Sequence, residues 1–251
     1  MEARVGTGSA LRPALRSAQA ALKGRLPAHY AGSWRDAFDS AVQRALRPGL
    51  RILDVGAGKS PALAPEKRPE GCRYVGLDLS RAQLEQAPVG SYDDWVVADA
   101  TDWVPGLADS FDLVLSFQVL EHVKPLAGAM ENLRRYLVPG GRLVAQLSGT
   151  FSVFGIANRL IPPGASMWLL ERLLHRPRET VFPAYYDHCW SSALLDMLSE
   201  WSSTKVTPIW WGANYFQFSA PLKAGYLVYE EWTRLAGYRN LAPYYVVEAA
   251  R

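Results

Sequence analysis

Short apolar runs alternate with helical segments between residues 50 and 150, and this alternation restricts the possible folds more than any other feature of the chain. Each run has four to six residues, is rich in Val, Leu and Ile, and is apolar along almost its whole length. Such runs are typical of strands that are buried on both faces of a parallel sheet. The runs are Arg51–Val55, Arg73–Asp78, Asp94–Ala98, Phe111–Ser116 and Arg142–Leu147.

Helical patterns lie before and between these runs. Ser33 and Ser80 are the expected N-caps of the first two helices, and a Pro-Gly-Gly turn at 139–141 follows the third. Regular alternation of strands and helices predicts an α/β fold with a doubly wound sheet. The helices are predicted at Gly32–Arg47, Arg81–Gln86 and Leu126–Leu137.

The sequence changes in character after Gly149. A helix capped by Ser191 or Ser192 is predicted at Ala193–Trp201, and residues 212–241 are interpreted as an inserted helix with its loops. Two late apolar runs that could close the sheet are Thr204–Trp211 and Tyr244–Ala249.

These patterns divide the chain into three parts. We expect an N-terminal arm or lid at 1–30, a cofactor-binding Rossmann-like core at 31–150, and an acceptor-binding lid with closing strands of the same domain at 151–251. The first part is expected to be helical because apolar residues recur there at helical spacing. They are Leu11, Leu15, Ala18 and Leu22.

Composition excludes several classes of protein. With 251 residues, 49% of them hydrophobic and 20% charged, the chain is long and apolar enough to fold around a real core. A net charge of +3 without a basic block does not favour nucleic acid as a partner. Two cysteines, Cys72 and Cys189, form neither a disulfide framework nor a metal motif. No stretch reaches the roughly 18 apolar residues of a membrane span. We therefore expect a cytoplasmic location.

Acidic and glycine residues follow three neighbouring strands of the predicted sheet. Gly56 and Gly58 form a tight turn directly after the first strand, where backbone can approach a ligand closely. Asp78 ends the next strand, 20 residues past Gly58, where a carboxylate can accept from both hydroxyls of a ribose. Asp99 follows the third strand and is placed to accept from an adenine amino group. The pattern predicts a site for an adenosine.

The turn differs from a dinucleotide fingerprint, because Pro61 stands near the position of its third glycine. A helix N-terminus that binds pyrophosphate is therefore poorly supported. An adenosine that carries an amino-acid tail fits better than NAD.

These residues, together with three later motifs, resemble class I S-adenosylmethionine-dependent methyltransferases. The resemblance spans residues 50–150 and implies a Rossmann-like sheet of seven mostly parallel strands, with helices on both faces, an antiparallel last strand and a helical, aromatic lid. The Gly-Lys-Ser-Pro form of the loop is similar to members from bacterial surface-glycan and natural-product pathways. The motifs are Asp54-x-Gly56-x-Gly58, Asp78, Asp99-Ala100, Phe111-Asp112, Val119-Leu120-Glu121-His122-Val123 and Leu137-x-Pro139-Gly140-Gly141.

The resemblance also implies roles for individual residues. Asp54 and the glycine loop would hold the methionine moiety, Asp78 the ribose, Asp99 with Ala100 the adenine, and Phe117 with Gln118 the surroundings of the sulfonium. Asp112 begins its strand and is expected to have a structural role. The full set of expected cofactor residues is Asp54, Gly56, Ala57, Gly58, Asp78, Leu79, Asp99, Ala100, Phe117 and Gln118.

Methylation of a hydroxyl requires a group that removes its proton. Two histidines are candidates for this base. His122 follows the fourth strand, and His188 precedes the predicted helix whose start commonly lines the acceptor pocket in related enzymes. The pairs Glu121-His122 and Asp187-His188 could alternatively meet at a divalent ion, but no metal-binding motif is apparent. No metal is expected.

Aromatic residues are dense after residue 150 and suit a lid over a sugar ring or an apolar small molecule. The apolar segment 151–174 could instead contact a membrane surface or a second subunit. The expected acceptor-binding residues are Tyr185, Tyr186, Trp190, Trp211 and Tyr215.

The sequence thus favours a methyltransferase that acts on a sugar, glycolipid or natural product, most simply by O-methylation of a glycosyl or natural-product hydroxyl. N- or C-methylation of a secondary metabolite, a catalytically silent module that binds S-adenosylmethionine, and an NAD-dependent oxidoreductase are the alternatives. Transfer of its methyl group would convert the cofactor S-adenosylmethionine to S-adenosylhomocysteine.

Overall fold

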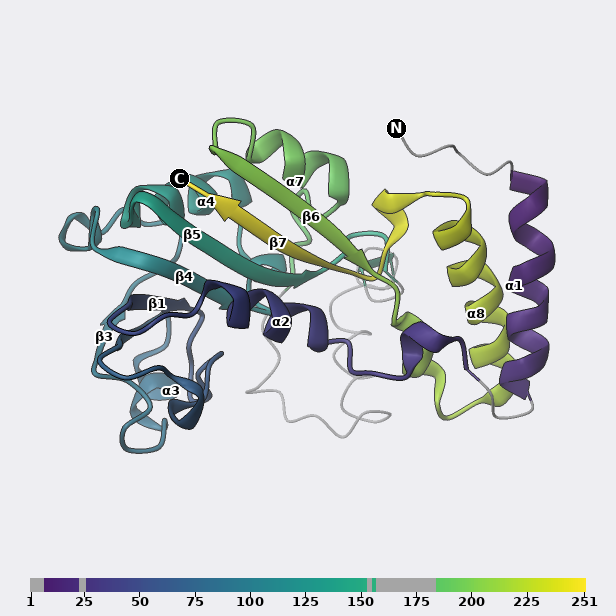
Figure 1. Cartoon of the computed structure of the whole chain (residues 1–251), viewed down its shortest axis with the longest axis horizontal. Helices are drawn as coiled ribbons and strands as arrows, with labels where there is room; N and C mark the ends of the chain where they lie inside the picture. Colours follow the sequence, from purple (N-terminus) through teal and green to yellow (C-terminus); the bar gives the residue numbers. More distant parts are fainter. Residues whose placement is uncertain (1–6, 23–25, 153–154, 157–183) are drawn as a thin grey trace.

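A computed structural model describes residues 7–22, 26–152, 155–156 and 184–251. Its centre is one sheet of seven strands in the order β3-β2-β1-β4-β5-β7-β6 (Figure 1). The strands are β1 (Arg51–Val55), β2 (Arg73–Asp78), β3 (Asp94–Val97), β4 (Phe111–Phe117), β5 (Leu137–Ser148), β6 (Ser203–Ile209) and β7 (Tyr244–Ala250). The seven-stranded α/β fold is therefore confirmed.

Strand direction also follows the expectation. β1 to β5 pair in parallel, whereas β7 lies antiparallel between β5 and β6. The chain moves outward from β1 to β2 and β3, then returns to place β4 on the other side of β1. Such a reversal of strand order leaves a crevice at the carboxyl ends of the strands, which is where open α/β sheets bind ligands.

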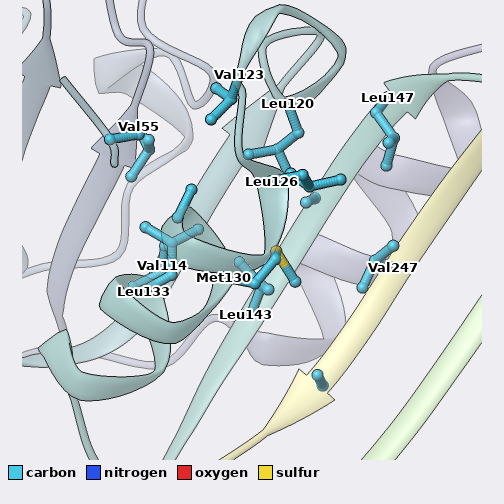
Figure 2. Close-up of a cluster of buried hydrophobic side chains, with 14 of the residues drawn as sticks. Val55, Val114, Leu120, Val123, Leu126, Met130, Leu133, Leu143, Leu147 and Val247 are labelled. Atoms are coloured by element: carbon cyan, nitrogen blue, oxygen red, sulfur yellow. The ribbon is translucent and has the colours of Figure 1, made fainter. Parts of the chain in front are cut away.

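Helices cover both faces of the sheet (Figure 1). Phe38, Ala41 and Val42 of α2 pack in a cluster with Ile52 of β1 on one face. The cluster on the other face joins β-strand side chains to α4 and α7 and is drawn in part in Figure 2. The helices are α1 (Thr7–Leu22), α2 (Asp36–Ala45), α3 (Arg81–Glu85), α4 (Leu126–Tyr136), α7 (Ser191–Met197) and α8 (Ala220–Leu235).

Alternation along the strands explains why the runs are apolar throughout. Leu53 and Val55 belong to the cluster under α4, while Ile52, directly before Leu53, belongs to the cluster under α2. Successive side chains of a strand point to opposite faces, and here both faces are covered. Burial of both faces thus requires apolar residues at consecutive positions.

The N-terminal helix packs against α8 rather than against the sheet (Figure 1). Its buried residues are Ala10, Ala14 and Ala18, whereas Leu11 and Leu15 are exposed. Small side chains four residues apart form one stripe of a helix, and this stripe is the buried one. The predicted helix is confirmed, but alanines rather than leucines form its buried stripe. Whether α1 acts as an arm or lid stays a prediction, as do the part boundaries.

Three local predictions were wrong. The helix predicted from residue 32 begins at Asp36, and the Ser33 hydroxyl accepts instead from the Arg35 backbone N–H at 3.2 Å. α7 begins at Ser191, so Ser191 and Ser192 lie inside it, and Ser192 pairs with Asn240. The Pro-Gly-Gly turn lies within β5, beside a shift in its register with β4.

No helix within the described ranges is long and apolar enough to cross a membrane. The segment 151–174, which we expected to contact a membrane or a second subunit, lies outside the described residues except for 151–152 and 155–156.

Candidate cofactor and acceptor site

The loop after β1 is built around two glycines with left-handed backbone. Gly56 has φ +72° and Gly58 has φ +52°. A Cβ on Gly56 would lie 2.2 Å from Cγ2 of Val119, so no larger residue fits there without movement of Val119. The Gly56 N–H donates to the Leu77 carbonyl at 2.7 Å. The loop therefore turns sharply over the carboxyl end of β1.

Asp78 joins this loop to the end of β2. Its Oδ2 accepts from the Gly58 N–H at 2.9 Å, and its Oδ1 accepts from the Ser80 N–H at 2.7 Å. The side chain is half-buried. Each carboxylate oxygen has two lone pairs, so both oxygens can accept a further hydrogen bond. Asp78, the predicted ribose-binding residue, thus lies directly beside the glycine loop.

Asp54, in β1 directly before the loop, binds the segment that follows the loop. The side chain is 1% exposed, and its Oδ2 accepts from the Ala62 N–H at 2.7 Å and from the Tyr74 hydroxyl at 2.8 Å. Burial raises the pKa of Asp54 to about 6, although the two hydrogen bonds and the positive charge of Arg68 act in the opposite direction. The geometry gives Asp54 a role in shaping the loop, and direct contact with a methionine group stays a prediction.

Tyr92 also holds the loop, and sequence analysis missed it. Its hydroxyl lies 2.8 Å from the Ala57 carbonyl oxygen and 3.1 Å from that of Gly58. The two segments are more than 30 residues apart in the chain. No sequence motif connects them, since only the parallel pairing of β2 and β3 brings Tyr92 to this place.

The predicted adenine side follows β2 and β3. Leu79 is 62% exposed although it is a large apolar residue, which leaves an apolar surface beside Asp78. Asp99 is exposed, and its Oδ1 accepts from both the N–H and the hydroxyl of Thr101 at 2.8 Å. Ala100 is buried, and its carbonyl accepts from Asn132 at 3.1 Å. An exposed leucine at this edge can lie against the flat face of a base, and the carboxylates of Asp78 and Asp99 can accept from amino or hydroxyl groups of a nucleoside.

An aromatic cluster surrounds Phe117 at the carboxyl end of β4. The Phe117 ring centroid lies 5.2 Å from that of Trp34 and 4.9 Å from that of Phe38. The Arg35 guanidinium lies 4.0 Å from the Phe117 ring centroid and donates to the carbonyl of Ala62. Arg35 was missed because a lone arginine at a helix start has no distinctive pattern. Its guanidinium is held by the Phe117 ring, by the Ala62 carbonyl and by the Asp39 carboxylate, whose Oδ1 accepts from the Arg35 Nε at 3.0 Å.

The aromatic cluster continues to two further rings. Trp34 stacks on Tyr244 at 5.1 Å, and Tyr244 packs on Tyr215 at 6.0 Å. Tyr215 is thereby connected to Phe117 through the rings of Tyr244 and Trp34. Trp211 stacks instead on Tyr30 at 6.0 Å, and its indole N–H donates to Gly32 at 3.2 Å.

A polar cluster lies beside the aromatic one, at the ends of β4 and β5. The Ser148 hydroxyl donates to Oε1 of Gln118 at 2.8 Å, and the Ser148 N–H donates to Oε1 of Glu121 at 3.2 Å. Gln118 Nε2 and Glu121 Oε2 are buried and have no hydrogen-bond partner among the described residues. Burial raises the pKa of Glu121, while the neighbouring His122 lowers it. One buried donor and one buried acceptor thus stay unsatisfied in the same cluster. Sequence analysis had not assigned Glu121 to the acceptor site.

Both candidate histidines are connected to this cluster. His122 ends the 3-10 turn Leu120–His122 and is half-buried. The backbone N–H groups of Tyr185 and Tyr186 both donate to the Glu121 carbonyl at 2.9 Å, which brings the segment 184–190 beside this turn. His188 is paired with Asp187, its Nδ1 lying 2.8 Å from the Asp187 Oδ1.

Other predicted acceptor residues lie in the same segment. Tyr186 is buried, Tyr185 is exposed, and the Trp190 ring packs between those of His188 and Phe151 at 5.1 and 5.8 Å. The structure therefore brings Tyr185 and Tyr186 to the polar cluster and Tyr215 to the aromatic one, whereas Trp190 packs on His188 and Trp211 on Tyr30.

Backbone strain is concentrated here. Gln118, Tyr186 and His188 have φ between +50° and +58°, and Asp109 is the other non-glycine residue with positive φ in the described chain. Such residues cost free energy and persist where the surrounding structure fixes them, often at functional sites.

A cavity of about 350 Å³ lies at the opposite edge of the sheet, at the amino ends of β1 to β4. Its two arginines are held by carboxylates, Arg51 by Asp112 at 3.0 Å and Arg73 by Asp94 at 3.4 Å. Asp112 therefore has the structural role expected of it. Across the described residues, no group of three or more His, Cys, Asp or Glu side chains could hold a metal ion.

Comparison with known proteins adds a family match. Residues 28–197 match the family model described as "Methyltransferase domain". The matched segment is more than half of the chain and includes the glycine loop, Asp78, Asp99 and both candidate histidines.

Curated relatives and solved structures are similar over different lengths. A ubiquinone biosynthesis O-methyltransferase of Chelativorans sp. (strain BNC1) is 35% identical over 45% of this chain and 47% of its own. The match thus spans about half of that relative. A protein of the same name from Brucella melitensis is 28% identical over 73% of both chains. Phosphoethanolamine N-methyltransferase 2 of Haemonchus contortus, solved with S-adenosylmethionine, has a TM-score of 0.55 and 16% identity, covering 86% of this chain and 52% of that one. This last likeness concerns the fold.

Proposed function

Because the chain belongs to the methyltransferase domain family, we propose that it transfers the methyl group of S-adenosylmethionine to a hydroxyl group of a small molecule. The observation that carries the proposal is the contact between Asp78 and the Gly58 N–H at the carboxyl ends of β1 and β2. It joins a left-handed glycine loop and a carboxylate with free lone pairs beside the point where the strand order reverses.

The residues of this edge fit S-adenosylmethionine. Asp78 holds the ribose, and Leu79 with Asp99 lies against the adenine. The loop from Gly56 to Gly58 gives the methionine chain close access to the backbone. Arg35 supplies a positive charge for the carboxylate of that chain.

S-adenosylmethionine, when bound, supplies a methyl carbon that leaves its sulfur as a nucleophile attacks. The chain must therefore hold the acceptor in line with that carbon and remove the proton of its hydroxyl. His122 and His188 are the candidates for the proton acceptor, since both are connected to the strand-end cluster around Glu121.

Two observations support a hydroxyl as the methylated group. The curated relatives carry O-methyltransferase in their names. The unsatisfied Gln118 Nε2 and Glu121 Oε2 suit a group that both accepts and donates a hydrogen bond, as a hydroxyl does. The rings of Phe117, Trp34 and Tyr215 suit the apolar face of a sugar or of a natural product. A glycosyl or natural-product hydroxyl is therefore the proposed acceptor.

Calorimetry and a labelling assay test the proposal in sequence. We expect S-adenosylhomocysteine to bind and NADH not to bind; the reverse result would favour an oxidoreductase. Labelled S-adenosylmethionine is then incubated with a panel of glycans and metabolites that carry free hydroxyls, beside O-methylated forms of the same compounds. Label in the free hydroxyl compounds alone supports O-methylation. Label in amines or at carbon would mean that the chain is an N- or C-methyltransferase instead. Cofactor binding without transfer to any compound would indicate a catalytically silent module.

A further inference from the structure

Asp187 bridges a helix N-terminus and an imidazole. Its Oδ2 accepts from the backbone N–H of Leu126, the first residue of α4, at 2.9 Å. Its Oδ1 lies 2.8 Å from Nδ1 of His188. Each oxygen of the carboxylate therefore serves a different partner, and the side chain cannot rotate without the loss of both contacts.

The surroundings of Asp187 keep it ionised. Burial opposes ionisation, but the Leu126 N–H, the contact with His188 and the charge of Lys124 together lower the pKa of Asp187. Leu126 also lies at the positive end of the backbone dipole of α4, which has 11 residues. An ionised carboxylate can only accept hydrogen bonds. The neutral imidazole of His188 must then carry its hydrogen on Nδ1, and its Nε2 keeps a free lone pair.

Packing fixes the orientation of this ring. It stacks on Trp190 with ring centroids 5.1 Å apart, and the backbone of His188 is held at φ +56°. The His188 side chain is 61% exposed, so a proton can reach or leave it. The Tyr185 and Tyr186 N–H groups bind the segment to Glu121, at the strand ends where the acceptor is proposed to lie.

We propose that Asp187 is a positioning residue that makes His188 the proton acceptor of the reaction, an inference that rests on the proposed function. The acceptor hydroxyl gives its proton to Nε2 of His188, and the electron pair of the broken O–H bond stays on the oxygen that is methylated. Asp187 neutralises the imidazolium that results and is not itself protonated. The arrangement follows the logic by which a carboxylate orients a catalytic histidine in other enzymes.

The tautomer of His188 tests the first half of the inference on the whole chain, with and without S-adenosylhomocysteine. We expect the ¹⁵N shifts of the neutral ring to show the Nδ1–H form. In Asp187→Asn, the amide oxygen can keep the Leu126 N–H while the amide nitrogen faces Nδ1 as a donor, so the ring should change to the Nε2–H form. An Nε2–H ring in the unchanged protein overturns the inference, and this measurement needs no variant. The same tautomer in both proteins also overturns it.

Methyl transfer tests the second half, with an acceptor found in the labelling panel. Asp187→Asn should lower kcat by about 10²–10⁴-fold, while the Kd of S-adenosylhomocysteine changes less than about twofold. Asp196→Asn, on α7, removes a nearby acid that is exposed and should leave both constants unchanged. Full kcat in Asp187→Asn with a reversed tautomer would exclude His188 as the proton acceptor. Failure of the unchanged protein to bind S-adenosylhomocysteine would count against the proposed function, and the tautomer would still decide the role of Asp187.

Discussion

Asp78 is the residue at which the ribose assignment can be tested most directly. Asp78→Ala should weaken binding of S-adenosylhomocysteine at least tenfold, because each lost hydrogen bond to a charged group contributes about 1.5–3 kcal/mol. The same change frees the Gly58 and Ser80 N–H groups, so the melting temperature should also fall. Asp112→Ala is the matched control, since it removes a strand carboxylate paired with Arg51 at the opposite edge. Calorimetry should find affinity lost in the first variant and kept in the second.

Arg35 provides a separate test of how the methionine tail is held. Arg35→Gln should weaken binding of S-adenosylhomocysteine by about tenfold or more, because one charge-assisted hydrogen bond to a carboxylate is lost. Binding of 5′-methylthioadenosine, which lacks that carboxylate, should be unchanged. Arg44→Gln is the control on α2, the helix that follows Arg35, where Arg44 pairs with Glu248 at 3.0 Å. Equal losses for both ligands would assign Arg35 to the stability of the loop instead.

Asp54 should make stability depend on pH. Its pKa is about 6 in the folded chain against an ordinary value of 3.8, so the folded state binds more protons between these values. Its contribution to the free energy of unfolding is therefore present at low pH and is lost as pH rises through about 6, by about 3 kcal/mol in total. Asp54→Asn does not titrate. Urea unfolding should show Asp54→Asn gaining stability relative to the unchanged protein between about pH 4 and 7. A constant difference would refute the raised pKa.

At the scale of elements, the strands and the starts of α3 at Arg81 and α4 at Leu126 could be predicted from sequence, whereas the starts of α2 and α7 could not. β1 and β2 have the bounds predicted for them, because burial on both faces leaves a continuous apolar signal. Helix starts depend on one hydrogen bond whose partner can be distant: Ser192 pairs with Asn240, 48 residues away, instead of capping α7. The candidate site also contains residues that could be predicted from sequence and residues that could not. The glycine loop and Asp78 follow from local sequence, whereas Arg35, Tyr92 and Glu121 acquire their contacts only through the fold.

The glycine loop and the turn after β4 should behave as one packed unit. Gly56→Ala should lower the free energy of unfolding by about 2–4 kcal/mol, from left-handed strain and from overlap with Val119. Gly58→Ala should cost only about 1–2 kcal/mol, since its Cβ would have Asp78 as nearest neighbour at 3.8 Å. Val119→Ala in the Gly56→Ala background should recover the free energy lost through overlap but not the part lost through left-handed strain. Denaturant unfolding of the unchanged protein, Gly56→Ala, Val119→Ala and the double variant measures the coupling, and simple additivity of the two changes would contradict direct contact.

At the scale of the whole molecule, one buried hydrogen-bond network joins Tyr30, in the N-terminal part of the chain, to residues 212–230 in its C-terminal part. The Tyr30 hydroxyl donates to Oε1 of Glu230 on α8 and accepts from the Ala213 N–H at 2.9 Å. The Oε2 of Glu230 accepts from the Gly212 N–H at 2.7 Å. The helix α1 packs on α8 beside this network, apart from the sheet (Figure 1). The stability of this helical part should therefore depend on Tyr30, while that of the sheet depends on its own two apolar clusters.

Tyr30→Phe should uncouple these parts. The change removes the hydrogen bonds of the buried Ala213 N–H and of Oε1 of Glu230, at a cost of about 1–3 kcal/mol each, and leaves that oxygen only the ion-pair contact with Nε2 of His29 at 3.9 Å. Amide hydrogen exchange should accelerate in α1 and α8 by at least about tenfold and stay unchanged in β1, β4 and β5, because local opening then needs less free energy than global unfolding. Tyr238→Phe is the control, since Tyr238 is 40% exposed and packs on Trp232 of the same helix. Equal acceleration in the sheet would mean that helical part and sheet unfold as a single cooperative unit, with the network stabilising the whole chain at once.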